Sequence, residues 1–240
     1  MIFLLHLFMK LKLTLLYVVS FLALTFFVHE IHDWAHTLVA RIISGCWGPR
    51  GFDSWKFCAE GSSSSGQRML ADLAGPLINF ILLWVGWQKM DEDNTLSEQS
   101  LGCSLVFASL PLSMLLGAAS GGGDLTDGIR LLFPHGNHRV ISLVGLLIMV
   151  IVCVPPLIKA FVVLPWWQGR LFFYPVFLVV PGILDHWLVG KVLNNWLVKT
   201  NAPEDKAYFW VIAWTVINLV ILLFTYRKLK QLISDEELPL

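Results

Sequence analysis

Long apolar segments separated by short polar stretches make up most of this chain. An apolar helix needs about 20 residues to cross the hydrocarbon core of a bilayer. Segments of about that length or longer lie near residues 13–40, 69–88, 101–119, 139–163, 168–190 and 206–226. The pattern therefore predicts an all-α, polytopic membrane protein with about six transmembrane helices.

Composition supports this prediction. The chain has 240 residues, of which 56% are hydrophobic and 14% charged, and a mean hydropathy of +0.69, whereas charged residues make up about 25% of a soluble domain. The formal net charge is zero, so the charge balance does not indicate nucleic acid as a partner. We expect a multi-pass membrane protein whose partners are the lipid bilayer and other membrane proteins, and the oligomeric state stays open.

One polar run interrupts the first apolar segment, and it reads His29-Glu30-Ile31-His32-Asp33-Trp34-Ala35-His36. A helix advances about 100° per residue, so His32 and His36 lie about 40° apart on one face, which His29 shares, with Asp33 just beyond it. Glu30 lies about 160° from His32 and is expected to be a flanking residue and not a ligand.

Two histidines at positions i and i+4 of a helix are a common way to hold zinc, and the residue after the first histidine can then act on a water molecule at the metal. That residue is Asp33. A lone pair of this kind is more often explained by packing or hydrogen bonding, so the metal interpretation needs support from other parts of the chain.

Three segments, in the same order, resemble the site-2 protease family of intramembrane zinc metalloproteases. The run from His32 to Arg41 resembles the His-Glu-x-x-His helix of that family. Ala-Gly-Pro-Leu-Ile-Asn-Phe at 74–80 looks like the family's Gly-Pro-x-x-Asn-Phe segment, and Asp-Leu-Thr-Asp-Gly-Ile-Arg at 124–130 looks like its Leu-Asp-Gly segment. The resemblance covers about residues 25–135.

We expect a single membrane domain over 1–240, with additional transmembrane helices at 139–226 and a tail at 227–240; the resemblance implies that 13–135 is a three-helix metalloprotease-like core. It further implies a site in which His32, His36 and Asp127 bind Zn²⁺, and three protein ligands leave a fourth position for water.

The same resemblance gives the catalytic roles. Asp33 would be the general base, and Asn79 would hydrogen-bond near the substrate or the developing oxyanion. Asp124 is a reserve metal ligand, although a helix N-cap beside three glycines explains it more readily. The implied activity is hydrolysis of a transmembrane or membrane-proximal peptide bond in a membrane protein substrate.

Asp33 departs from the family pattern, which has Glu at this position. Losing one methylene withdraws the carboxylate by about 1 Å, and a displacement of that order can lower a rate about 100-fold. The alternative is therefore a catalytically impaired relative that acts as a membrane scaffold or binding subunit. A di-iron oxygenase or a haem protein is a third class that also places histidines on helices.

Two further features lie outside these motifs. His29 adds an imidazole one turn before His32, and it suits an extra ligand, a partner of the ligands or a packed histidine. Asp185 and His186 lie within an apolar segment, where ionisable groups tend to face a cavity or a partner. The neighbouring Pro181 and Gly182 predict a break in that helix.

Counting one crossing per segment places the end of the first segment, the start of the second and the region around Asp127 on one side of the membrane. Lys and Arg are slightly more numerous on that side, which favours a cytoplasmic active site. Cys46 and Cys58 bracket the first loop, and a disulfide between them depends on which compartment the loop faces. Cys103 and Cys153 lie in apolar runs and are expected to be buried thiols.

Overall fold

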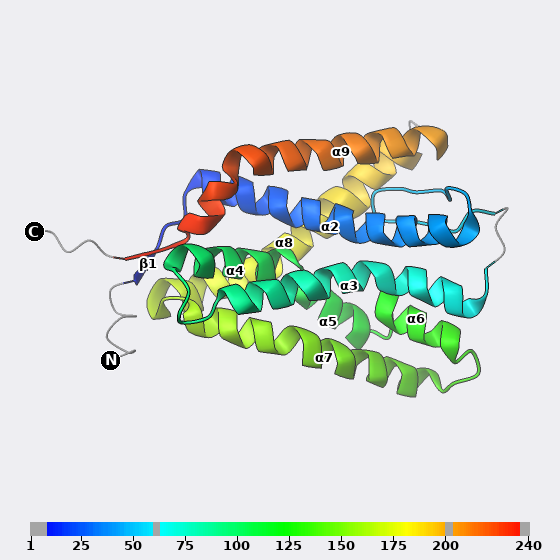
Figure 1. Cartoon of the computed structure of the whole chain (residues 1–240), viewed down its shortest axis with the longest axis horizontal. Helices are drawn as coiled ribbons and strands as arrows, with labels where there is room; N and C mark the ends of the chain where they lie inside the picture. The colour runs from blue at the N-terminus through cyan, green and yellow to red at the C-terminus, as the bar shows by residue number, and fades with distance from the viewer. Residues whose placement is uncertain (1–8, 60–62, 200–203, 236–240) are drawn as a thin grey trace, which may run out of the picture.

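The computed structural model describes residues 9–59, 63–199 and 204–235. Long helices lie side by side in one elongated bundle (Figure 1). The first and last described elements, β1 (Met9–Leu11) and β2 (Ile233–Asp235), pair as antiparallel strands at one end of it. The last five residues of the predicted tail, 236–240, lie outside the described residues.

Six helical spans are long and apolar enough to cross a membrane, which confirms the predicted fold class. They are α2 (Leu15–Ser44); α3 (Ser65–Lys89); α4 (Leu96–Ala108) with α5 (Pro111–Ala119); α7 (His138–Val163); η1 (Trp166–Phe173), α8 (Tyr174–Asp185) and η2 (His186–Lys199); and α9 (Glu204–Thr225) with η3 (Tyr226–Gln231). A short helix, α6 (Asp124–Leu132), lies between the third and fourth spans.

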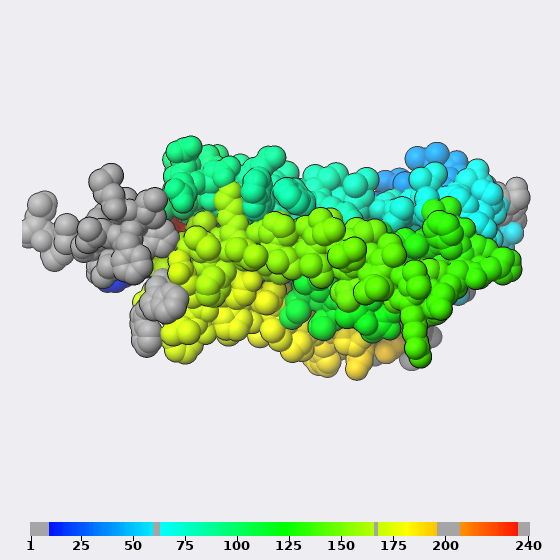
Figure 2. Space-filling view, turned by 90° about the horizontal axis from the view of Figure 1, so that it is seen from below, coloured from blue at the N-terminus to red at the C-terminus, as the bar shows by residue number. Residues whose placement is uncertain are grey.

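The outer surface of the bundle is apolar. Figure 2 shows the face along which α7 runs almost the whole length of the bundle. Large apolar side chains of α7 point outward there, including Leu143 (65% exposed), Leu147 (57%) and Ile151 (60%). Six long apolar helices with large apolar side chains exposed require apolar surroundings, so the protein is an integral, multi-pass membrane protein.

The helices pack around a core in which aromatic and aliphatic side chains interlock. Tyr17 and Phe21 of α2 are each 1% exposed, and the Tyr17 hydroxyl lies 3.1 Å from the Ser104 hydroxyl of α4. Cys103 and Cys153 are fully buried free thiols, as predicted. In a bilayer, the van der Waals packing of such side chains and hydrogen bonds between helices fix the helices relative to one another.

Local hydrogen bonds cap both ends of the first span. The Thr14 side chain caps the start of α2 by accepting a hydrogen bond from the Tyr17 N–H. Gly45 ends the helix with a φ of 79°, and its N–H donates to the Arg41 carbonyl. This left-handed conformation favours glycine, and it turns the chain into the first loop.

The first loop, residues 45–59, folds back over the end of α2. Cys46 and Cys58 form a disulfide, which answers the question that the sequence left open. An antiparallel bridge joins Arg50 to Trp55 inside the loop. Phe52 is 1% exposed and packs in a small hydrophobic cluster that also contains Phe26 of α2. The loop is thus a defined part of the structure, and we call it the site loop.

Two spans are irregular. The third span breaks at Leu110, whose φ is 52°, before Pro111 starts α5. The fifth span does not break at Pro181, so that prediction was wrong: α8 runs through Pro181 to Asp185, and a π-helix begins at His186. The span therefore continues past Pro181 as a helix and changes to the wider π-helical turn at His186, in place of the predicted break.

Candidate metal centre

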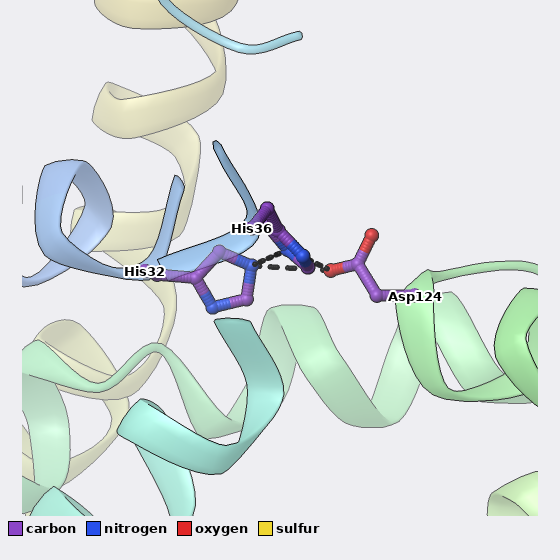
Figure 3. Close-up of side chains that lie close together, drawn as sticks. All are labelled: His32, His36 and Asp124. Carbon is purple, nitrogen blue, oxygen red and sulfur yellow. Dashed lines mark hydrogen bonds and ion pairs between the residues drawn. The ribbon is translucent and has the colours of Figure 1, made fainter. Parts of the chain in front are cut away.

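Three side chains from two separate helices converge near the first loop. His32 and His36 project from α2, and Asp124 projects from the first turn of α6 (Figure 3). The two Nε2 atoms lie 3.1 Å apart, and the Asp124 Oδ2 atom lies 3.1 Å from His32 Nε2 and 3.5 Å from His36 Nε2. This arrangement of two imidazoles and a carboxylate could hold a metal ion.

His36 is held in an orientation that suits a ligand. Its Nδ1 atom lies 2.7 Å from the Ala71 carbonyl of α3, and the residue is 1% exposed. A carbonyl oxygen only accepts, so Nδ1 donates to it and Nε2 is the nitrogen that faces the cluster. The ring of Trp55 in the site loop stacks on His36, with centroids 5.0 Å apart and an interplanar angle of 11°. The imidazole is therefore fixed from two sides.

Gly75 makes room for the two histidines. A Cβ atom at this position would lie 2.2 Å from His36 Nε2 and 2.7 Å from His32 Nε2. Any side chain here would push α3 away from α2. The Gly-Pro segment noted in the sequence thus lies directly against the histidine pair, and the glycine is needed because the helices approach so closely.

The third side chain of the cluster is Asp124, the reserve candidate. Asp127 points elsewhere: its Oδ1 atom lies 2.6 Å from Arg130 Nη1, and its side chain is 51% exposed. Three residues further along α6 correspond to about 4.5 Å of rise and a turn of about 60° away from the same face. The structure therefore corrects the assignment of the third residue from Asp127 to Asp124.

Asp124 is also not a helix N-cap. Gly123 occupies the N-cap position with a φ of 82°, and no side chain caps α6 there. Burial tends to raise the pKa of the Asp124 carboxyl, but its hydrogen bonds to His32 and His36 outweigh burial and lower that pKa well below the ordinary value. The carboxylate is therefore ionised beside the two imidazoles, as a metal ligand must be.

A cavity of about 410 Å³ opens beside this cluster. Helices α2, α3, α5, α7 and α8 and the site loop all contribute to its walls. Both residues that the sequence analysis proposed as catalytic, Asp33 and Asn79, line it together with His32, His36 and Asp124. The structure thus brings these two residues to the same space as the candidate ligands.

Asn79 is tied to the break in the third span. Its Nδ2 atom donates to the carbonyl of Ser109 at a distance of 3.3 Å. Ser109 is the C-cap residue of α4, where the helix ends at the break. Its Oδ1 atom is buried and has no hydrogen-bond partner among the described residues. A buried acceptor without a partner is costly, and a ligand with an N–H group would satisfy it.

Asp33 lies on the side of the cavity next to His29. It is 6% exposed, and its Oδ2 atom lies 4.0 Å from His29 Nε2. Its backbone carbonyl also accepts a hydrogen bond from the Thr37 hydroxyl within α2. No hydrogen-bond partner of Oδ2 occurs in the part of the chain that the structure describes.

His29 and Asp185 both reach the cavity, although they are 156 residues apart in the chain. His29 Nδ1 lies 2.9 Å from Asp185 Oδ2. The sequence analysis singled out both residues but could not pair them. His186 itself is exposed and does not line the cavity.

Three contributors to the site were missed by the sequence analysis. Trp55 and Asp53 come from the site loop, and Gly75 was noted only as part of a motif. Burial raises the pKa of the Asp53 carboxyl above its ordinary value. Neither loop residue has a sequence signal of its own, because a loop's path over a helix depends on tertiary packing.

Glu30 points away from the cluster, as predicted. It pairs with Arg50 of the site loop at 2.9 Å, and both side chains are fully buried. The Arg50 guanidinium lies 4.1 Å from the centre of the Trp34 ring. This pair fastens the site loop to α2 and takes no part in the cavity.

The fold and the site together define a polytopic helical membrane protein with a candidate metal centre between α2 and α6. No family model, no curated protein and no solved structure matches the chain. The resemblance to the site-2 proteases therefore stays a prediction.

Proposed function

We propose that this protein is an intramembrane zinc metalloprotease that hydrolyses a peptide bond within or next to the membrane. The observation that carries the proposal is the spacing of the three donor atoms. Tetrahedral zinc with bonds of about 2.0–2.1 Å separates its nitrogen and oxygen ligands by about 3.3 Å. The separations in the cluster are 3.1, 3.1 and 3.5 Å.

In this proposal His32, His36 and Asp124 hold the zinc, and the cavity leaves space for water and substrate beside them. Bound zinc supplies polarisation of the scissile carbonyl and a lower pKa for water. Asp33 then takes the proton from the attacking water as the general base. Asn79 binds the substrate backbone, with its unpartnered Oδ1 atom accepting from a peptide N–H.

The position of the cavity supports a substrate that is embedded in the membrane. Its walls come from five of the six membrane spans and from the site loop. A peptide bond that reaches Asn79 and Asp33 must enter between helices, where little water competes for hydrogen bonds. Such a site strengthens the electrostatic effects of its polar groups.

Asp33 supports one alternative, a non-catalytic relative that binds other membrane proteins. Its carboxylate is one methylene shorter than the Glu of the family that the sequence resembles, and its Oδ2 atom lies beside His29. The substitution Asp33→Glu separates the two functions. A protease limited by reach gains activity from the longer side chain, whereas a scaffold cleaves nothing in either form.

The disulfide bears on the orientation of the protein. Cys46 and Cys58 lie in the site loop, and disulfides persist in oxidising compartments. Arg50, which contributed to the charge bias towards a cytoplasmic site, is a buried partner of Glu30 and not a free loop charge. We therefore propose that the site faces an oxidising compartment, opposite to the side that the charge count favours. Modification of single cysteines introduced at Ser54 and Glu92 by a membrane-impermeant maleimide tests this orientation.

Elemental analysis and a cleavage assay on the detergent-purified protein test the function. We expect about one zinc per chain and cleavage of membrane-spanning peptides, with Asp33→Asn inactive but still loaded with zinc. Zinc without cleavage by either the wild type or Asp33→Glu would favour the scaffold. Iron in place of zinc would contradict the protease, because two histidines and one carboxylate also form the iron site of oxygenases.

A further inference from the structure

His29 occupies a second polar cluster at the cavity, separate from the candidate ligands. Its Nδ1 atom lies 2.9 Å from Asp185 Oδ2, and its Nε2 atom lies 3.2 Å from the Phe52 carbonyl. The side chains of His29 and Asp185 are 13% and 11% exposed. The pair joins α2, which carries the histidines, to the end of α8 in the fifth span.

The contacts of His29 indicate its protonation state. A carboxylate and a carbonyl are both acceptors, so a neutral imidazole would turn a lone pair towards one of them. An imidazolium donates to both. Two carboxylates flank this ring: Asp185 Oδ2 lies 2.9 Å from Nδ1 and Asp33 Oδ2 lies 4.0 Å from Nε2, and Asp53 of the site loop lines the same cavity. These acceptors favour the imidazolium form of His29.

Asp33 lies on the other side of the same ring. Its Oδ2 atom is 4.0 Å from His29 Nε2 and has no hydrogen-bond partner among the described residues. The attraction between this carboxylate and the imidazolium is strong, because both side chains are largely shielded from water. The position of the Asp33 carboxylate therefore depends on a cation that Asp185 holds in place.

We propose that Asp185 and His29 form an ion pair that positions the Asp33 carboxylate for its role at the cavity. The fifth span then completes a site whose metal ligands and substrate contacts come from other elements. This inference rests on the proposed function, because it gives Asp33 a task to perform. It also explains why α8 carries a buried carboxylate. A charged group within an apolar span is energetically costly, and such groups are usually paired or functional.

The competing explanation is a purely structural contact that fastens α8 to α2. The two explanations make different demands on the side chain at position 29, which faces Asp33. For positioning, the group facing Asp33 must be a cation. For fastening, either partner can occupy either helix as long as the pair persists.

The experiment compares the wild type with Asp185→Asn and with the exchanged pair His29→Asp/Asp185→His. Asp91→Asn is the matched control, because Asp91 pairs with Lys159 away from the cavity. For each protein we would measure zinc per chain, thermal stability, kcat and KM for a membrane-spanning peptide, and the ¹⁵N shifts of the His29 ring. The variant His29→Gln assigns the ring signals.

We expect zinc content to stay at the wild-type value in every variant. In Asp185→Asn kcat should fall about 10- to 100-fold with KM changed less than about twofold, as expected for a displaced catalytic group, and Asp185→Glu should recover part of it. The exchanged pair should fold but stay as slow as Asp185→Asn, because it places a carboxylate beside Asp33. Normal kcat in the folded exchanged pair would overturn the proposal.

The ¹⁵N shifts decide the ion pair without any need for activity. Both ring nitrogens of His29 should carry protons in the wild type and in Asp91→Asn, and one proton should be lost in Asp185→Asn. A neutral ring in the wild type would overturn the inference even if the enzyme is active. If no protein cleaves the peptide but the ring is doubly protonated, the proposed protease fails while the ion pair stands.

Discussion

The two faces of α2 carry polar clusters of opposite character, although neighbouring residues build them. On one face, His32 and His36 meet Asp124 beside a cavity of about 410 Å³. On the other, Glu30 and Arg50 form an ion pair with no exposed side-chain surface. Among the described residues, buried polar atoms without a hydrogen-bond partner occur on both faces. What separates the two clusters is access, so one can bind a ligand and the other can only stabilise the fold.

The variant with the largest expected effect disrupts only the cluster beside the cavity, which we call the open face. The double substitution His32→Ala/His36→Ala removes two of three ligands, and we expect bound metal to fall from about one per chain to none. Elemental analysis of the purified protein measures it. His135→Ala/His138→Ala is the matched control, because both histidines are exposed, and metal retained by the first variant would disprove the centre.

The second variant disrupts only the buried ion pair of Glu30 and Arg50 on the opposite face of α2. Arg50→Met leaves the buried Glu30 without its cationic partner, which should lower the free energy of unfolding by about 3–5 kcal/mol. Denaturation in a rising fraction of dodecyl sulfate measures this loss, and metal per chain should not change.

Two further variants sharpen this test. Glu30→Met/Arg50→Met removes both charges and should recover most of the stability. Lys89→Met breaks the exposed pair with Glu98, whose side chains are 33% and 44% exposed, and should cost less than about 1 kcal/mol. An equal loss in Lys89→Met and Arg50→Met would show that burial is not the cause.

The third prediction distinguishes the two aspartates of α6. Asp124→Asn should weaken metal binding about 100-fold, or about 2.7 kcal/mol, because it removes a charged ligand. Asp127→Asn should leave the affinity unchanged, since Asp127 pairs with Arg130. Competition with a chelator of known affinity measures both, and the opposite ranking would restore the ligand set implied by the sequence resemblance.

The smallest expected effect concerns the space around the open face. Gly75→Ala would place a methyl group 2.2 Å from His36 Nε2, so α3 must shift, and metal affinity should fall about 10-fold, or about 1.4 kcal/mol. Gly66→Ala near the start of the same helix meets nothing within 4 Å and serves as the control. The same chelator titration applies, and equal affinities would show that the close approach is unimportant.

Local sequence was sufficient for the parts of the molecule that depend on near neighbours. Apolar segments of about 20 residues form helices wherever a bilayer surrounds them, and all six predicted spans are present. The pairing of His32 with His36 and the orientation of Glu30 away from them follow from helical periodicity alone. Gly45 ends the first helix for the same local reason.

Other features depend on where distant segments meet. The choice of Asp124 over Asp127 is set by the placement of α6 against α2, because the two residues differ by less than one helical turn. The neighbours of His29, the disulfide of the site loop and the course of the fifth span through Pro181 were likewise beyond local reasoning. Periodicity along one helix determines which side chains share a face, whereas packing between helices determines what that face meets.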